Sequence, residues 1–144
     1  MQTPWKTFFF IACCALSVSS GAQNHSKPDT DCIAAWETPS GALQGHWVAD
    51  IDGIASPTHL HLDRHPEWSG MVKGSVRHGR EEAVMVGDVN DGEVTLEESR
   101  NGVNISATWL GDVVENSCAT EIRGQYLEGE TAPARSFVLR KQTP

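Results

Sequence analysis

Three histidines lie close together in the stretch "THLHLDRH" at residues 58–65, and imidazoles at such spacing could bind a metal ion. His59 and His61 alternate with Leu60 and Leu62, so on an extended strand the histidines share one face and the leucines share the other. Exposing the leucines would cost about 1.5 to 3 kcal/mol each, which favours their burial. We therefore predict that His59, His61 and the following His65 lie in solvent.

A metal site is the alternative for this stretch. His59 and His61 would supply two ligands to zinc or copper, and His65 would supply a third. A structural zinc site normally has four ligands, and the spacing of the neighbouring residues does not single out a fourth. We therefore expect no metal and no other cofactor.

Motifs of hydrolytic enzymes are missing from the sequence, which has no nucleophile elbow, no phosphate-binding glycine loop and no metalloprotease helix. Glu97 and Glu98 are neighbours, so on a strand their carboxylates point to opposite faces and do not share a site. We predict that Glu97 is solvated, that Glu98 lies at a rim or turn, and that the protein is not an enzyme.

Regularly spaced turn signals separate the elements that carry these residues, for example "DG" at 52–53 and "NDG" at 90–92. Between the turns, apolar and polar residues alternate as they do on half-buried strands; Val103, Ile105 and Trp109, for instance, share one face. The expected strands cover residues 43–51, 58–64, 71–77, 82–89, 93–99, 103–109, 118–126 and 135–141. This pattern predicts an all-β fold, a single antiparallel up-and-down barrel of about eight strands with short hairpin turns.

Residues 1–22 have the pattern of a secretory signal peptide, with Lys6 before an apolar core and small residues up to Ala22. Residues 23–41 are polar and contain two prolines, so we expect an N-terminal arm there and the barrel domain at 42–144. The protein is then secreted or periplasmic, and no integral membrane segment is expected. A lipid anchor at Cys13 is the alternative to cleavage near Ala22.

Cys32 and Cys118 are the two cysteines that remain after removal of residues 1–22, and in an oxidising compartment we expect them to form a disulfide. The chain carries 11 basic and 19 acidic residues, a formal net charge of −8. Such a surface repels phosphate backbones, so nucleic acid is not an expected partner.

Aromatic residues on the apolar faces of the expected strands could line the barrel interior: Trp47, Trp109, Tyr126 and Phe137. They either pack as core or form the walls of a ligand pocket at one barrel mouth. Trp68 lies in a turn, where it could form a contact surface or fold over a barrel end.

Two stretches resemble known small barrels. Gly45-His46-Trp47 resembles the G-x-W signature of lipocalin-like and avidin-like barrels, and Trp109 followed by Ala119-Thr120 and Gly124-Gln125-Tyr126 is similar to an avidin and streptavidin stretch. The resemblance implies an eight-stranded barrel that binds a small ligand, with Trp109 as a wall and Thr120 as a hydrogen-bond donor. Cys118 and Ile122 depart from the avidin pattern, so biotin is not the expected ligand.

Lipocalin-like barrels also have a basic residue on the final strand that packs over the first-strand tryptophan, and the resemblance gives Arg140 that role. Small bacterial protease-inhibitor barrels are similar in size, in G-x-W and in a free N-terminal arm.

The sequence thus predicts a non-enzymatic binding protein that takes a small apolar or mixed ligand at a barrel mouth, with Trp47, Trp109, Thr120 and Tyr126 as the ligand-binding residues. The alternatives are a barrel that binds a secreted protein, such as a protease inhibitor, and an envelope structural domain without a small ligand.

Overall fold

Apolar side chains at every second position build the strands of this chain. In the computed structural model, which describes residues 32–143, Leu60 and Leu62 are buried while His59 between them is exposed. The predicted signal peptide and residues 23–31 of the predicted arm lie outside the described residues. Eight strands and two short 3-10 helices follow one another in the order η1 (Ala35–Glu37), η2 (Ser40–Leu43), β1 (Gly45–Ile51), β2 (Thr58–Arg64), β3 (Met71–His78), β4 (Glu81–Asn90), β5 (Glu93–Ser99), β6 (Ala107–Val113), β7 (Glu121–Glu128) and β8 (Arg135–Lys141).

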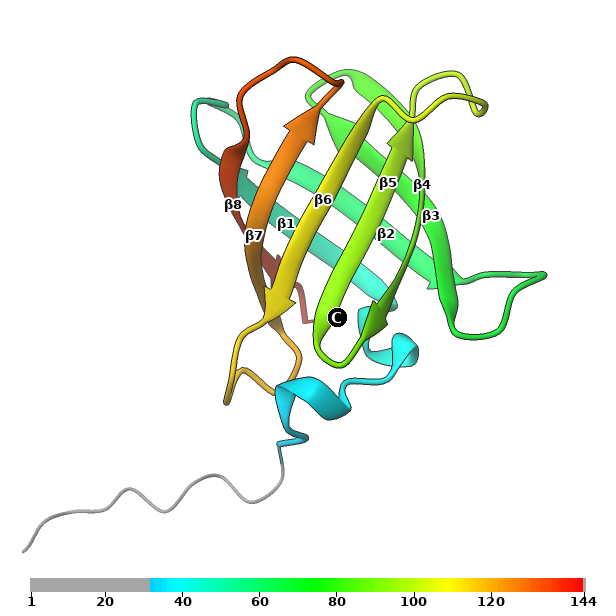
Figure 1. Cartoon of the computed structure of the whole chain (residues 1–144), viewed down its shortest axis with the longest axis vertical. Coiled ribbons are helices and arrows are strands. Elements are labelled where there is room, and N and C mark those ends of the chain that lie inside the picture. Colours follow the sequence, from blue (N-terminus) through cyan, green and yellow to red (C-terminus); the bar gives the residue numbers. More distant parts are fainter. Residues whose placement is uncertain (1–31, 144) are drawn as a thin grey trace, which may run out of the picture.

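Each strand pairs antiparallel with the next one, and β1 pairs with β8, which closes the barrel (Figure 1). The predicted fold class is confirmed. Closure leaves no strand of the barrel with an unpaired edge.

Consecutive hairpins place the connections alternately at two ends of the barrel. We call the end with residues 32–44 and the turns 65–70, 91–92 and 114–120 the arm end, and the end with the loops 52–57, 79–80, 100–106 and 129–134 the mouth end. In Figure 1 the two short helices lie at the lower end of the barrel and the β5–β6 loop at the upper end. Residues of the β2–β3 turn at the arm end and of the β5–β6 loop at the mouth end line the same hollow on the outer surface.

The interior is packed with side chains. Trp109 contacts Tyr126 and Phe137 edge to face, with ring centroids 4.9 and 5.0 Å apart. Such pairs are favourable beyond the area that they bury. The predicted aromatic core is therefore present as a packed cluster.

Two glycines within the strands are required by the strand spacing. A Cβ atom at Gly74 would lie 1.8 Å from the carbonyl oxygen of His61, and one at Gly124 would lie 1.9 Å from that of Leu110. A side chain at either position would collide with the neighbouring backbone, so only glycine allows these strands to approach.

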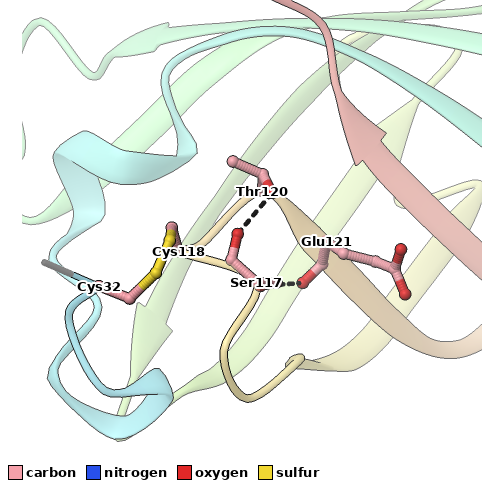
Figure 2. Close-up of a disulfide and its surroundings, with 5 residues drawn as sticks. All are labelled: Cys32, Ser117, Cys118, Thr120 and Glu121. Atoms are coloured by element: carbon pink, nitrogen blue, oxygen red, sulfur yellow. Dashed lines mark hydrogen bonds between the residues drawn. A yellow bond between two sulfur atoms is a disulfide. The ribbon is translucent and has the colours of Figure 1, made fainter. Parts of the chain in front are cut away.

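The arm end is covered by residues 32–44. Cys32 forms the predicted disulfide with Cys118 in the β6–β7 turn (Figure 2), at a sequence separation of 86. Such a loop gives a stabilisation of about 4 to 5 kcal/mol in the chain-entropy model. Ala35 and Thr38 are buried, whereas Trp36 remains 61% exposed.

Trp47 is anchored at the arm end by its indole N–H, which donates to the carbonyl of Leu43 at 2.8 Å. The basic residue over its ring is Lys141, whose Nζ lies 5.4 Å from the ring centroid and donates to the carbonyl of Ala42. Burial lowers the pKa of Lys141. The expectation of Arg140 in this role is wrong, because Arg140 points to the opposite face of the strand and pairs with Asp50.

None of the helices in residues 32–143 is long and apolar enough to cross a membrane.

Candidate functional site

The four predicted ligand-binding residues do not lie together. Trp47, Trp109 and Tyr126 are in the core with exposed fractions of 1%, 0% and 2%. Thr120 lies outside it, exposed in the β6–β7 turn, where its hydroxyl donates to the carbonyl of Ser117 (Figure 2). Ligand contact by these residues stays a prediction, and the structure gives them packing and turn-forming roles.

The histidines of residues 58–65 divide between two environments. His59 is exposed and His61 half-buried on the outer face of β2, but His65 is buried. Its Nδ1 accepts the backbone N–H groups of Glu67 and Trp68, both at 3.1 Å. The prediction that His65 faces solvent is wrong, because the β2–β3 turn uses this nitrogen to satisfy two of its amides.

These histidines do not assemble into a metal site. In the described part of the chain, no group of three or more histidine, cysteine, aspartate or glutamate residues is arranged to hold a metal ion. The closest aromatic neighbour of His61 is His46 on β1, whose ring stacks on it at 4.3 Å.

A row of polar side chains crosses the barrel interior toward the mouth end. Glu98 is fully buried, and its Oε2 accepts the indole N–H of Trp109 at 3.2 Å and contacts His78 Nε2 at 3.0 Å. His78 Nδ1 in turn lies 3.1 Å from the hydroxyl of Thr58. The predicted rim or turn position of Glu98 is wrong, while Glu97 does point to the opposite, outer face.

The other carboxylate oxygen of Glu98, Oε1, has no hydrogen-bond partner among the described residues. A buried acceptor without a donor costs about 1 to 3 kcal/mol, and more when it is charged. No pattern in the sequence separates Glu98 from an ordinary strand glutamate; the only signal is its position in register with the apolar residues Val94 and Leu96.

Thr58, His78 and Glu98 have the hydroxyl, imidazole and carboxylate order of a hydrolytic triad. Nucleophilic attack needs an acyl carbon in contact with the hydroxyl, but Thr58 is 0% exposed and His78 closes over it. The row therefore acts as a tie between β2, β3, β5 and β6 rather than as a nucleophile site.

Tyr126 lies next to this row, with its ring centroid 5.9 Å from that of His78. Burial raises the pKa of the Tyr126 phenol, and the nearby carboxylates of Glu98 and Glu128 raise it further. Arg100 and Glu128 form an exposed ion pair of 2.7 Å at the same end. This hydrogen bond lowers the pKa of Glu128 and raises that of Arg100.

A hollow of about 460 Å³ lies outside the barrel, over the outer faces of β3, β4 and β5, and we call it the outer groove. Its residues are His65, Glu67, Trp68, Lys73, Val84, Val86, Glu97, Glu98, Ser99, Gly102, Val103 and Ile105. Outward-facing Val84 and Val86 of β4 form the floor. The β2–β3 turn and the β5–β6 loop both project on the right-hand side of Figure 1, with β3 and β4 between them.

One wall of the outer groove is the β5–β6 loop, which presents Val103 and Ile105 with exposed fractions of 84% and 56%. The side-chain oxygen of Asn101 accepts the backbone N–H groups of Val103 and Asn104, both at 2.9 Å. The backbone N–H of Ser106 donates to the carbonyl of Glu98 at 2.7 Å. These bonds hold apolar side chains in water at defined positions.

The expected strand at 103–109 therefore starts later than predicted, at Ala107. Val103 and Ile105 continue the apolar alternation of β6 but do not enter the core, because the Asn101 turn and the Ser106 bond close the chain into a loop before the strand begins.

The other wall is Trp68, which is 56% exposed. Its ring stacks on buried His65 with centroids 4.6 Å apart and an interplanar angle of 15°. The imidazole thus fixes the orientation of the indole while the rest of the indole remains open to the groove.

Charged side chains flank the floor. Lys73 of β3 pairs in register with Val86, and Val86 pairs with Glu97 of β5, so the two charges stand on either side of the valine. Within residues 32–143, neither Lys73 nor Glu97 takes part in a salt bridge. The groove therefore combines an apolar floor and walls with Lys73 and Glu97 at its flanks, and Glu67 is a second acidic residue of the lining.

No protein-family model matches this chain, and no curated protein matches its sequence at a significant level.

Proposed function

We propose that this chain is a secreted or periplasmic, non-enzymatic binding protein that takes a small apolar or mixed ligand in the outer groove. The observation that carries the proposal is the fixed presentation of exposed apolar side chains around one hollow: Trp68 by stacking on His65, and Val103 by the Asn101 turn. Holding such groups in place before binding reduces the entropy that a ligand has to overcome.

The volume of the groove supports a small ligand, because pockets for such molecules usually measure about 300 to 1,000 Å³ and combine apolar walls with a few polar groups. The predicted position at the barrel mouth is replaced by one on the side wall next to it, since core packing leaves the predicted residues Trp47, Trp109 and Tyr126 nearly inaccessible. The disulfide and the signal-like residues 1–22 support the proposed secreted or periplasmic location.

A titration with the apolar dye N-phenyl-1-naphthylamine tests the proposal. We expect saturable binding to the mature protein and an affinity about tenfold lower for Trp68→Ala, because the indole is the largest apolar wall. Val84→Asn should weaken binding as well. Leu110→Asn is the matched control, since Leu110 is 47% exposed, close to the 42% of Val84, but lies outside the groove.

Binding that is absent, or that Leu110→Asn weakens as much as Val84→Asn, would contradict the outer groove as the site. Circular dichroism of each variant would check that the barrel remains folded.

Protein binding through the arm is the second candidate function. Ile33 and Trp36 beside the disulfide are 43% and 61% exposed, as expected for residues that contact a partner protein. Trp36→Ala would then abolish inhibition of a secreted protease while leaving dye binding unchanged.

A further inference from the structure

The row formed by Lys73, Val86 and Glu97 determines which kind of small ligand suits the outer groove. The three residues are consecutive partners across β3, β4 and β5 and line the same hollow. Neighbouring strands lie about 4.8 Å apart, so the backbones of Lys73 and Glu97 are roughly 10 Å apart across the groove.

Some outward-facing charges of the barrel are paired, whereas others, such as Arg77 and Glu93, are not. Arg140 pairs with Asp50 at 2.9 Å and with Glu121 at 3.4 Å, and Arg100 pairs with Glu128 at 2.7 Å. Lys73 and Glu97 have no such partner in the described part of the chain, and the apolar side chain of Val86 separates them. The groove thus places one cation and one anion at a defined spacing across Val86, and Glu67 is a further acidic residue of its lining.

Closure of the barrel excludes one common way of binding a peptide. Because every strand is paired on both sides, no edge is free for a peptide backbone to join as a further strand. A ligand in this groove has to be recognised through its side chains and its charged ends.

We propose that the ligand is a short apolar peptide of about three residues with free ends, its carboxylate near Lys73 and its ammonium group near Glu97. An extended chain covers about 3.3 to 3.6 Å per residue, so three residues match the roughly 10 Å between the two charges. Lying across β4, the peptide places apolar side chains on Val84 and Val86, toward Trp68 on one side and Ile105 on the other. This inference rests on the proposed function and adds the ligand class to it.

Displacement of N-phenyl-1-naphthylamine by trivaline tests the inference on the mature protein. We expect free trivaline to displace the dye, and the N-acetylated and C-amidated forms to bind about fivefold more weakly each, the upper range for a solvent-exposed ion pair. High salt should weaken free trivaline but not the doubly blocked form.

Two variants assign each end of the peptide. In Lys73→Met, amidation of the peptide carboxylate should no longer lower its affinity. In Glu97→Gln, acetylation of the peptide amine should no longer lower its affinity. The dye affinity of each variant is measured separately, and the effect of blocking either peptide end is taken as a ratio of affinities within that variant. Arg77→Met and Glu93→Gln are matched controls on the outer faces of the same strands but outside the groove, and should leave both ligands unaffected.

The failures are distinguishable. Dye binding without displacement by trivaline overturns the peptide inference and leaves the binding function intact. Equal displacement by free and doubly blocked peptide also overturns it, since the ends would then play no part. No binding of either dye or peptide overturns the proposed function together with the inference.

Discussion

The inside of the barrel near its mouth and the outer groove reverse the usual distribution of polar and apolar groups. Inside, Glu98 lies fully buried with one carboxylate oxygen unpartnered; outside, Trp68 and Val103 are 56% and 84% exposed. Polar partners hold both arrangements in place: His78 and Trp109 bind the carboxylate, while His65 and the Asn101 turn position the exposed apolar groups.

The two regions differ in what holds them. The interior row is embedded in packed side chains, so its loss should affect stability, whereas the groove is held by a turn and a loop, so its loss should affect binding. A buried polar group or an exposed apolar group can serve either the stability of the fold or a binding site on the surface. The surrounding residues determine which of these two roles it has.

The largest expected effect comes from the tryptophan that joins the carboxylate to the core. Trp109→Ala should lower the free energy of unfolding by about 4 kcal/mol, because it leaves a cavity beside Tyr126 and Phe137 and removes a donor from Glu98. Urea denaturation would measure it. Trp68→Ala, the matched control, should cost less than about 1 kcal/mol, as surface substitutions do. Similar losses for the two tryptophans would break the comparison.

A smaller effect is expected from the imidazole of the interior row. His78→Leu should destabilise the protein by about 3 kcal/mol, because it leaves the fully buried carboxyl group of Glu98 with a single hydrogen-bond partner. Adding Glu98→Leu should recover part of this loss, since it removes the buried carboxyl group but leaves the indole N–H of Trp109 without its acceptor. Thermal and chemical denaturation of the two variants would measure the difference. A double variant less stable than His78→Leu would show that Glu98 stabilises the fold without its partner.

The smallest effect is a dependence of stability on alkaline pH. Burial raises the pKa of Tyr126 above its ordinary value of 10.0, so the folded protein keeps the phenol proton when the unfolded chain has lost it. The stabilising contribution is complete below pH 10 and is lost as the pH rises above it, by at most about 1.4 kcal/mol for each pH unit. Tyr126→Phe should remove that part of the slope in urea denaturation between about pH 10 and 11.

Tyr126 is the single tyrosine of the chain, so the absorbance change of phenolate reports on it directly. Titration of this absorbance at the ordinary pKa in the folded protein would contradict the prediction.

Alternation along the chain was enough to predict an eight-stranded fold and the bounds of three strands, but not the bounds of β6 and β7. β2, β5 and β8 have the expected bounds. Strand periodicity is local, and so are the turn signals between the strands, which is why a single sequence carries both.

The outer groove could not be predicted in the same way. The alternation of Val103 and Ile105 continues into Ala107, so it indicates a strand, yet side-chain and backbone bonds from Asn101 and Ser106 close a loop there. Likewise, burial of His65 depends on two amides of the following turn, and burial of Glu98 on donors from β3 and β6. Such partners are set by tertiary contacts that the pattern of apolar residues does not encode.

The pairing of β1 with β8 has a consequence for the order of events during synthesis. Each of the other pairs joins neighbouring segments and can form as the chain grows, but closure needs residues 135–141, which emerge after the other seven strands. Until then the edges of β1 and β7 are open to other chains. A pause before β8 leaves the nascent chain exposed to misassembly, so the interval between the seventh and eighth strands is the moment at which a chaperone would matter most.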